Sequence, residues 1–294
     1  MSRADAEGVA PVANTAGADP VIVGMEVLIE DVRFSYPSGV EAVKGVSLSI
    51  RPGERVAIVG QNGAGKTTLV RQLNGIFRPT SGRVQVGDWI TSEHTIAELA
   101  TRVGYVFQNP DEQLFARTVR ADVEFGPRNL GLDSAQVARR AETAIEAVGL
   151  SGVADLHPHH LSLSERKRVA LAGVVAMGTP VVVLDEPTTG QDAAGVDMIA
   201  QVVAALTDAG RTVIAITHDM EFCAEHFDRV IVMAGGQVLV DGHPRDVFVR
   251  DAELDAAAVE PPQLTRLARA LGWDDQPLSA EEFVGAFARR GAHS

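Results

Sequence analysis

The sequence predicts an α/β fold built on a mostly parallel sheet with helices on both faces. Three observations support it: a glycine-rich loop between a strand-like run and a helical pattern, apolar strands that alternate with helices, and two carboxylates directly after one such strand. Strands that alternate with helices favour parallel pairing, because each crossover helix carries the chain back to the same end of the sheet. In such sheets, ligands bind at the carboxyl ends of the strands.

The first fifty residues predict a leader followed by antiparallel strands. Residues 1–24 are rich in alanine, glycine, aspartate and valine and lack the basic and apolar regions of a secretory signal, so we interpret them as a disordered leader. From Met25 to Ile50 the chain alternates as strands do, with turns at 36–39 and 51–53. An N-terminal antiparallel β subdomain is therefore expected before the glycine-rich loop.

The run Gly60–Thr68, which reads GQNGAGKTT, has the spacing of a phosphate-binding loop. It follows an apolar run at 55–59 and opens a pattern expected to be a helix carrying Leu69, Leu73 and Ile76. The loop glycines let the backbone curl so that its N–H groups point at phosphate oxygens, and the helix dipole adds positive potential. A structural turn is the alternative, but it does not account for the Lys-Thr pair or for the flanking strand and helix.

Two side chains of the loop are suited to a nucleotide. Lys66 is expected to reach the β- and γ-phosphates, and the Thr67 hydroxyl is expected to ligate Mg²⁺. These expectations predict a nucleotide-binding core, and the loop resembles that of P-loop NTPases, which implies a RecA-like core.

The rest of the chain continues the alternation and ends in a separate helical segment. Further strands are expected at 83–86, 102–106, 181–184 and 212–216, and helices at 119–125, 135–148, 164–177 and 196–206. Short strands at 229–233 and 238–241 flank a hairpin turn. Pro261-Pro262 starts one late helix, and Ser279–Glu282 forms a capping box for another. We therefore expect a nucleotide-binding domain at 25–249 with a helical insert at about 109–178, and a small helical C-terminal extension at 250–294.

Bulk composition excludes several classes of protein. The 294 residues are 46 % apolar, which is ample for a buried core, and the net charge of −13 argues against a nucleic-acid partner because such proteins need a basic surface. A lone cysteine, Cys223, excludes a disulfide within the chain and is expected to be a small buried side chain. The longest apolar tract, 169–184, is interrupted by glycine and proline and is shorter than the ~20 residues of a transmembrane helix.

Two acids follow the apolar strand at 181–184. Asp185 and Glu186 should therefore lie at the edge of the sheet next to the phosphate loop. Hydrolysis needs one carboxylate to hold Mg²⁺ and another to orient the attacking water, so we assign Asp185 to the metal and Glu186 to the water. A solvated strand cap is the alternative interpretation.

Two more polar residues follow neighbouring strands. His218 closes the strand at 212–216, where a neutral imidazole could link the γ-phosphate to Glu186. Although a lone histidine at a strand end is usually incidental, its place in this order of motifs favours a site residue. Gln108 follows the strand at 102–106 and offers an amide that could ligate Mg²⁺ and sense a docked partner.

Together these residues resemble the ATP-binding cassette (ABC) family over about 25–249. The resemblance implies ATP and Mg²⁺ as ligands, ATP hydrolysis, and a face-to-face dimer with a second ABC ATPase subunit, homotypic or heterotypic. It matches Gly60–Thr68 to the Walker A loop, Gln108 to the Q-loop, 181–186 to Walker B, 190–192 to the D-loop and His218 to the switch histidine. Tyr36 would match the aromatic that stacks on adenine, unless it is an ordinary turn residue.

One motif departs from the family pattern. The family signature Leu-Ser-Gly-Gly-Gln corresponds here to Leu161–Glu165, which reads LSLSE. In the family this segment contacts the γ-phosphate held by the opposite subunit. Ser162 keeps its hydroxyl, but the side chains at 163 and 164 replace glycine and Glu165 adds negative charge near an anionic ligand. We therefore expect weakened turnover at the site that this signature faces.

A longer motif resembles energy-coupling-factor importers of cobalt, nickel and vitamins. It comprises 107–115, 118–122 and 125–131. The resemblance implies a peripheral subunit on the cytoplasmic face of the cell membrane, bound to a transmembrane T component and working with a substrate-binding membrane subunit. Coupling helices of the T component would lie in a groove beside 108–115, where Leu114 and Phe115 are expected to be exposed, with a buried Phe115 as the alternative.

Other interpretations remain open. A metal site at His157, His159 and His160 is disfavoured, because Pro158 breaks the register and no further ligand pair is nearby. The chain could be a catalytically weakened, nucleotide-binding regulatory half of a heterodimer. A soluble cassette ATPase of translation or DNA repair is disfavoured by the acidity and the importer-like insert. The helices from about 262 to 290 are expected to add dimer contacts.

The predicted site therefore has three groups of residues. The catalytic residues are Lys66, Glu186 and His218. The nucleotide-binding residues are Tyr36, Gly60, Gln61, Asn62, Gly63, Ala64, Gly65, Lys66, Thr67, Thr68, Gln108, Ser162 and Asp185. The Mg²⁺ ligands are Thr67, Gln108 and Asp185.

Overall fold

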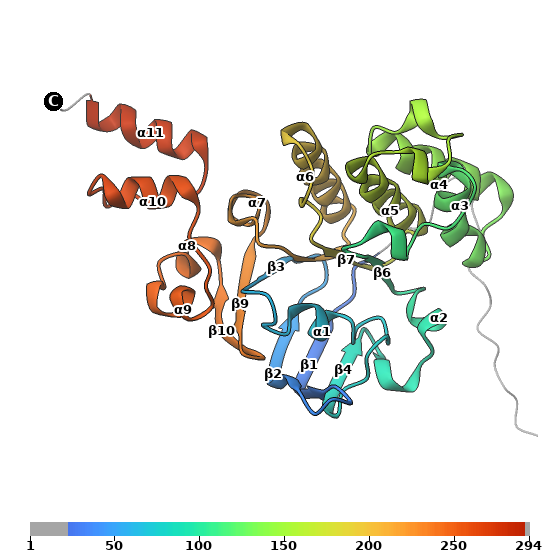
Figure 1. The fold of residues 1–294 in the computed structure, drawn as a ribbon, viewed down its shortest axis with the longest axis horizontal. Coiled ribbons are helices and arrows are strands. Elements are labelled where there is room, and N and C mark those ends of the chain that lie inside the picture. The colour runs from blue at the N-terminus through green and yellow to red at the C-terminus, as the bar shows by residue number, and fades with distance from the viewer. Residues whose placement is uncertain (1–22, 292–294) are drawn as a thin grey trace, which may run out of the picture.

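The computed structural model describes residues 23–291, which form two sheets and a set of surrounding helices (Figure 1). Within this range a four-stranded sheet has the order β2-β1-β4-β5 and a six-stranded sheet has the order β10-β9-β3-β8-β7-β6. The first comprises β1 (Val27–Ser35), β2 (Glu41–Ile50), β4 (Ser81–Val86) and β5 (Trp89–Ile90). The second comprises β3 (Arg55–Val59), β6 (Val103–Val106), β7 (Val181–Asp185), β8 (Thr212–Ile216), β9 (Arg229–Ala234) and β10 (Gln237–Gly242).

Both sheets confirm the predicted α/β fold with an antiparallel β subdomain. Strand β1 pairs antiparallel with β2 and β4. In the larger sheet β3, β6, β7, β8 and β9 run parallel to one another, and among the described strands of this sheet only the edge strand β10 is antiparallel, to β9. The parallel strands therefore bring their carboxyl ends, and the polar residues that follow them, to one edge.

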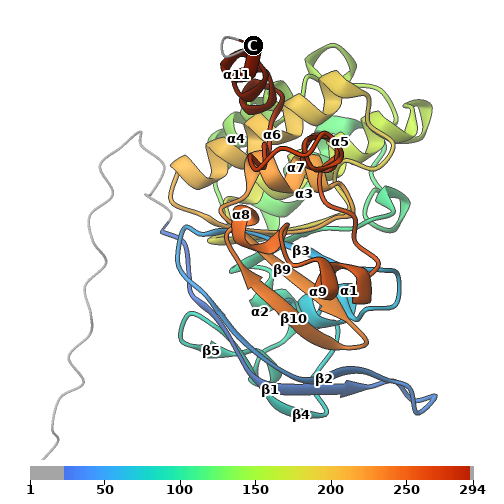
Figure 2. The same cartoon turned by 90° about the vertical axis from the view of Figure 1, so that its left-hand side faces the viewer.

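The six-stranded sheet is buried on both faces. Successive residues of β3 alternate between two buried clusters: Ala57 and Val59 pack with the helices, whereas Val56 and Ile58 face the antiparallel sheet. Figure 2 shows the sheet lying between these two layers. Burial of both faces explains the nearly continuous apolar sequence of these strands, because neither face meets water.

Several of the helices begin directly after a polar capping residue. The described helices are α1 (Lys66–Val70), α2 (Ile96–Leu99), α3 (Val119–Asn129), α4 (Ser134–Ala147), α5 (Leu163–Met177), α6 (Ala193–Asp208), α7 (Met220–His226), α8 (Pro244–Val247), α9 (Asp251–Ala256), α10 (Gln263–Ala270) and α11 (Ala280–Gly291). Asp133 and Ser162 each form a capping box at the start of α4 and α5. The helices α3, α4 and α5 pack on one another as the predicted helical insert. None of the described helices has the length and apolar character needed to cross a membrane.

The helix after the phosphate loop is shorter than predicted. Helix α1 ends at Val70, so Leu73 and Ile76 lie beyond it in a series of turns. The N–H of Leu73 donates to Val70 O at 3.0 Å, three residues back, and Gly75 has a φ of 76°. Leu73 is buried as its spacing predicts, but a tightened turn ends the helix before it and a left-handed glycine follows.

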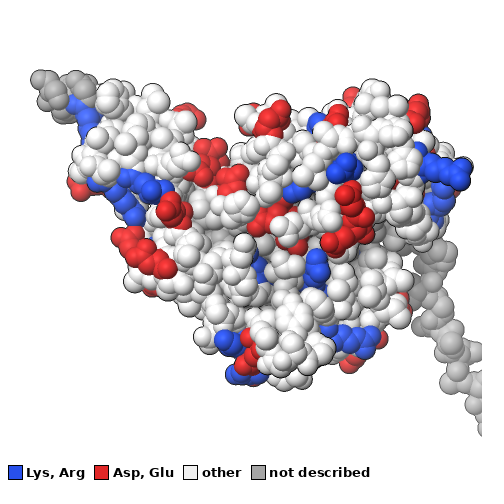
Figure 3. Space-filling model, viewed as in Figure 1, with Lys and Arg blue, Asp and Glu red and all other residues white. Residues whose placement is uncertain are grey.

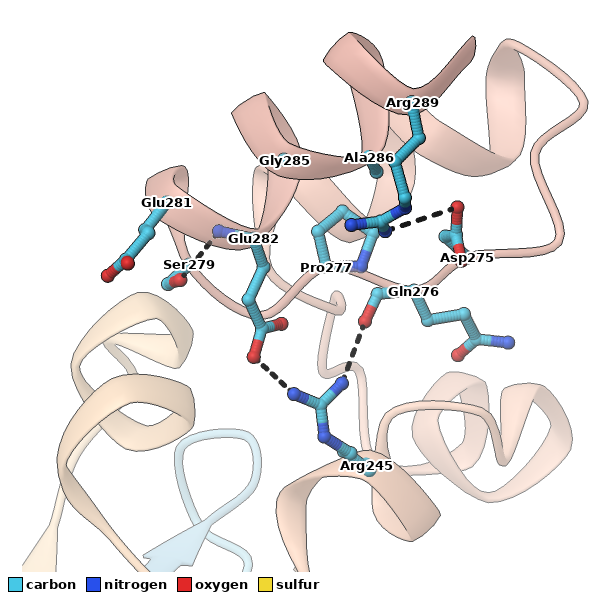
Figure 4. Close-up of a pocket in the computed structure, with 10 residues that line it drawn as sticks. All are labelled: Arg245, Asp275, Gln276, Pro277, Ser279, Glu281, Glu282, Gly285, Ala286 and Arg289. Carbon is cyan, nitrogen blue, oxygen red and sulfur yellow. Dashed lines mark hydrogen bonds and ion pairs between the residues drawn. The ribbon is translucent and has the colours of Figure 1, made fainter. Parts of the chain in front are cut away.

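Of the C-terminal helices, α8 and α9 pack against β9 and β10 at the edge of the larger sheet, and α10 packs on α11. Ala257 and Val259, which follow α9, belong to the same buried cluster as the helical face of that sheet. Arg245 of α8 donates to the carboxylate of Glu282 and to Gln276 O, so it ties α8 to α11 (Figure 4). The division at residue 250 stays a prediction, and residues 1–22 of the expected leader lie outside the described range.

Two local expectations have different outcomes. Cys223 is fully buried, as expected. The capping box predicted for α11 is only half formed: Ser279 Oγ accepts from Glu282 N at 3.2 Å, but the Glu282 carboxylate accepts from Leu278 N instead of Ser279 N.

Candidate nucleotide site

The phosphate loop lies between β3 and α1, and tight packing of its backbone explains two of its glycines. Gly60 has a φ of 144°, and a Cβ there would lie 2.1 Å from Met233 O. Gly65 has a φ of 98°, and a Cβ there would lie 2.3 Å from Ala42 O. Any side chain at either position would push the loop away from β9 or from the β2 hairpin.

Lys66 is the buried cation of the loop. Its ammonium donates to Gly60 O at 2.6 Å and to Gln61 O at 3.1 Å. Burial lowers the pKa of Lys66, and the nearby charges of Glu186 and Asp185 partly oppose that shift. The lysine therefore lies where backbone carbonyls hold it beside two carboxylates.

Tyr36 is fixed to the last residue of the loop. Its hydroxyl and the Thr68 hydroxyl are 2.7 Å apart, and its ring meets Phe34 and Phe77 edge-on at 5.0 and 5.7 Å between centroids. Two predicted nucleotide-binding residues are thus brought together. Their joint position could have been guessed only from the folded antiparallel subdomain.

Asp185 is held by a tyrosine that the sequence analysis did not single out. Tyr105 of β6, the strand adjacent to β7, donates its hydroxyl to Asp185 Oδ2 at 2.8 Å. The other oxygen, Oδ1, is buried and has no hydrogen-bond partner among the described residues. Burial raises the pKa of Asp185, and Tyr105 and the cations Arg71 and Lys66 lower it in part. An unpaired buried carboxylate oxygen fits a bound cation, since an uncompensated buried charge is costly.

Glu186 has a strained backbone and a dense set of partners. Its φ is 53°, in the left-handed region that side chains other than glycine rarely adopt. Its N–H donates to Ile216 O at 2.8 Å, and its own carbonyl accepts from the buried Lys167 ammonium at 2.9 Å. Strain of this kind persists only where the surroundings hold it, and it is common at functional sites.

The carboxylate of Glu186 meets His218 across the gap between β7 and β8. Glu186 Oε2 lies 2.7 Å from His218 Nδ1 and accepts from Thr189 Oγ1 at 3.3 Å. The carboxylate is 10 % exposed and the imidazole 69 % exposed, so the pair joins a buried acid to an accessible ring. Asp219, directly after the histidine, caps α7 and fixes this turn.

One cavity of about 550 Å³ brings some of these groups together, but Tyr36, Lys66 and Asp185 are not among the residues that line it. It is lined by Gly60, Gln61, Asn62, Gln108, Glu186, Thr189 and His218. Its remaining wall comes from the start of α7 and from residues 258–266 of the C-terminal extension, which the sequence analysis did not connect to the site. Ser162 is not among the residues that line this cavity.

The altered signature is engaged in bonds within its own subunit. Ser162 Oγ donates to Glu165 Oε2 at 2.7 Å, and Ser162 N donates to the same oxygen at 2.8 Å. These bonds from Ser162 lower the pKa of Glu165. Ser164 Oγ lies 2.6 Å from Oε1 of Gln191, whose amide nitrogen donates back to Ser164 O at 3.2 Å.

A second, largely apolar cavity of about 250 Å³ lies between the helical insert and the sheet edge. Phe115 and Phe125 line this cavity, and their rings meet edge to face with 4.6 Å between the centroids. Phe115 is 64 % exposed and Phe125 is 45 % exposed. The expectation that Leu114 is exposed is wrong, because Leu114 is buried with Val119 and Val123. Exposed Phe115 agrees with the prediction for that residue.

The three histidines before the signature form a local turn. His157 Nδ1 accepts from His159 N at 3.2 Å, so one ring nitrogen of His157 is used in capping. Within residues 23–291 no group of three His, Cys, Asp or Glu side chains is arranged to hold a metal ion.

Comparison with known proteins assigns the chain to a family. The sequence pattern described as "ABC transporter" matches residues 43–189. The energy-coupling factor transporter ATP-binding protein EcfA of Methanoculleus marisnigri is 42 % identical over 88 % of this chain and 97 % of its own length. EcfA of Methanocaldococcus jannaschii is 42 % identical over 84 % of this chain and 89 % of its own.

Solved structures agree with this assignment. CbiO1 of Clostridium perfringens, described as part of the ABC transporter complex cbiONQ, is 34 % identical with a TM-score of 0.70 and covers 84 % of this chain and 98 % of its own. The cassette MJ0796, solved as a dimer in a post-hydrolysis state bound to ADP and phosphate, is 27 % identical with a TM-score of 0.69 over 74 % of this chain and 98 % of its own. The chain therefore belongs to the ABC transporter family of ATP-hydrolysing transport subunits.

Proposed function

We propose that this chain is the ATP-hydrolysing subunit of an energy-coupling-factor type importer, with its site residues in the roles predicted from the sequence. The observation that carries the proposal is the 2.7 Å pairing of Glu186 with His218 on the wall of the cavity that the phosphate loop also lines. The EcfA names of its relatives support this class of transporter.

The phosphate loop holds the triphosphate in this proposal. Main-chain N–H groups of Gly60–Thr68 surround the phosphates, and Lys66 exchanges the carbonyls of Gly60 and Gln61 for phosphate oxygens. Tyr36, anchored by Thr68, stacks on the adenine.

Asp185, Thr67 and Gln108 are the residues that would hold Mg²⁺. The unpaired Oδ1 of Asp185 supports this assignment, because a buried carboxylate oxygen is suited to a hard cation. When bound, Mg²⁺ supplies positive charge to the phosphate oxygens during transfer.

Glu186 directs the attacking water, and His218 holds Glu186. Among the bonds that the described residues make to the carboxylate, those from Thr189 and His218 both go to Oε2. We therefore assign Oε1 to the water, which it orients in line with the γ-phosphate and polarises. The strained backbone of Glu186, fixed by Ile216 and Lys167, keeps the carboxylate aimed at one place.

The apolar cavity beside Phe115 and Phe125 is the proposed contact with the membrane. Coupling helices of a transmembrane T component would cover the two exposed rings. The Asp122 carboxylate fixes the segment that carries Phe115, because it accepts from the N–H groups of Phe115 and Ala116 at 3.1 Å. The chain would then work at the cytoplasmic face of the membrane. A separate membrane subunit would bind the cargo, which we propose to be a cobalt or nickel ion or a vitamin.

A second ABC ATPase subunit completes the proposed assembly. In this arrangement Ser162 faces the γ-phosphate of the partner, and helices α10 and α11 add contacts between subunits. Exposed apolar side chains on these helices, or directly after one of them, support that contact: Leu267, Leu271, Val284 and Phe287.

The proposal is tested by reconstitution with candidate membrane subunits. We expect ATP-dependent uptake of one cargo class into vesicles, measured with cobalt, nickel and vitamins in parallel, and loss of uptake with Glu186→Gln. Uptake that persists in the Glu186→Gln complex would refute the role of Glu186, and failure of every membrane subunit to bind the chain would refute the importer class.

The signature segment favours a second candidate, a catalytically weakened regulatory half of a heterodimer. Ser162 is paired to Glu165 and both signature glycines are absent, so the site in the partner subunit would be poorly completed. ATPase assays of this chain alone and with candidate partner ATPases separate the two candidates. Hydrolysis by the chain alone would exclude the regulatory half, which requires another ATPase with an intact signature.

A further inference from the structure

A short segment of the C-terminal extension closes one side of the nucleotide cavity. We call residues 257–266, which run from the end of α9 into α10, the strap. The strap lines the cavity beside the phosphate loop with Ala258–Pro261, Gln263 and Arg266. Figure 3 shows the molecule hollowed between the C-terminal helices and the cassette, with acidic and basic side chains around the hollow.

The strap is fixed to both halves of the site. Gln61 N, in the phosphate loop, donates to Ala257 O at 3.0 Å. Gln263 N, at the start of α10, donates to Glu221 Oε1 at 2.8 Å, and Glu221 follows His218 by three residues. Buried Ala257 and Val259 anchor the strap in the main core, so the position of the first turn of α10 is set by the cassette itself.

The charges of the cavity wall are unbalanced. Three carboxylates line it, those of Glu186, Glu221 and Glu260, whereas Arg266 is the single Lys or Arg among the lining residues of the described chain. A triphosphate brings further negative charge to this space, so the carboxylates repel it and a cation on the wall lowers that repulsion. Arg266 is paired with Glu260, and the two side chains are 50 % and 76 % exposed.

We infer that Arg266 is a further nucleotide-binding residue, whose guanidinium stabilises the phosphate charge and whose pairing with Glu260 competes with that role. The inference rests on the proposed ATP site. Binding of the triphosphate draws the guanidinium from the Glu260 carboxylate toward the phosphates, because phosphate and carboxylate compete for the same planar donors. The C-terminal extension thereby becomes part of the nucleotide site.

Removing the positive charge of Arg266 and, in a second variant, the negative charge of Glu260 distinguishes a nucleotide-binding role of Arg266 from a structural one. The affinity of the full chain for a non-hydrolysable ATP analogue is measured by titration calorimetry for Arg266→Gln and Glu260→Gln. We expect Arg266→Gln to weaken binding about threefold to tenfold and Glu260→Gln to tighten it about twofold to threefold, with both effects reduced in 0.5 M salt. A merely structural pair would change affinity in the same direction in both variants, with little dependence on salt.

Controls keep the outcome clear. Arg269 lies on the same helix as Arg266, but its guanidinium donates to Asp251 and to Phe248 O, and it does not line the cavity. Arg269→Gln should therefore leave nucleotide affinity unchanged. Both charged side chains are at least half exposed, and thermal melting checks that the variants fold. Shifts of the same sign, or no shift in either variant, would overturn the role of Arg266. A wild-type chain that does not bind the analogue would instead refute the proposed function.

Discussion

The phosphate-loop region and the signature region of this cassette use their polar groups in different ways. Around the loop, Asp185 keeps an unpaired buried oxygen and Glu186 keeps a strained backbone. In the signature segment, Ser162 pairs with Glu165 and Ser164 pairs with Gln191. Polar groups that lack a hydrogen-bond partner or carry backbone strain are suited to bind a ligand. Polar groups that are hydrogen-bonded to each other must first break that bond before they can contact a ligand. We therefore expect the site on this chain to be prepared for nucleotide, and we propose that its signature segment completes a partner site poorly.

The largest expected effect is on the phosphate-loop side. Glu186→Gln should lower the rate of ATP hydrolysis by about 10²–10³-fold, because an amide orients water but polarises it poorly. ATP binding should persist, since the bonds to Thr189 and His218 need only an acceptor oxygen. Phosphate release and nucleotide binding are measured on the same preparation.

Lys66→Ala is the contrasting variant. It should lose ATP affinity as well as turnover, because it removes the buried ammonium from the loop. Normal turnover in Glu186→Gln would contradict the contrast between the phosphate-loop region and the signature region, because ATP would then not be hydrolysed at the site that contains Glu186.

Restoring the signature is expected to have the next largest effect. A variant with Leu163→Gly and Ser164→Gly should raise the ATPase rate of the assembled dimer by up to about 10²-fold, the scale of one transition-state donor. The variant removes the Ser164 to Gln191 contact and clears the close approach to phosphate. Steady-state ATPase assays of the dimer give the rate.

The matched control separates shape from hydrogen bonding. Leu163→Ala with Ser164→Ala also removes the Ser164 hydroxyl but keeps a Cβ at both positions. If this control accelerates hydrolysis as much as the glycine pair, the Gln191 contact and not crowding is the impairment. An unchanged or lower rate in the glycine variant would contradict the prediction.

Local spacing predicted the fold and named the residues at the centre of the candidate site. Short motifs mark the loop at 60–68, the acids after β7 and His218 after β8. Parallel strands bring their carboxyl ends, and therefore these residues, to the same edge of the sheet. The antiparallel subdomain followed from alternation alone. Each of these signals spans only a few consecutive residues, so no tertiary information was needed to find it.

Tertiary packing determines the parts that were missed. Tyr105 supports Asp185 from an adjacent strand, and Lys167 supports Glu186 from helix α5. The strap reaches Gln61 from nearly two hundred residues away along the chain. Leu114 and Phe115 are adjacent apolar residues with opposite exposure, which only the packing of α3 decides. Composition and spacing carry no signal for such contacts.

Exposure of Phe115 predicts a smaller effect on a third surface. Phe115→Ala should weaken binding to a membrane partner about tenfold, the scale of losing one aromatic contact at an interface. The ATPase rate of the isolated chain should not change. Val40→Ala, which also trims an exposed apolar side chain, lies on the antiparallel subdomain and should leave assembly unchanged. Pull-down from detergent with a tagged T component measures the loss, and equal retention of both variants would contradict the docking assignment.

The smallest expected effect concerns the stability of the folded protein, which the buried negative charge of Asp185 lowers when no cation is bound. Burial raises the pKa of Asp185 above its ordinary value of 3.8, so the folded chain holds the ionised form less favourably than the unfolded chain does. This cost is absent well below pH 3.8, appears as the pH rises above that value, and is complete once the pH exceeds the raised pKa of the folded state.

Asp185→Asn removes the charge and should raise the melting temperature of the nucleotide-free protein at pH 7 by about 2 °C. The difference should narrow as the pH falls toward 4, and it should reverse with Mg²⁺ and ATP, because only the wild type gains the full stabilisation by ligand. Thermal melts across pH, with and without Mg²⁺ and ATP, measure all three outcomes. A less stable Asp185→Asn protein at pH 7 without ligand would show that the phosphate-loop region carries no such cost, and the contrast with the signature region would then rest on Glu186 alone.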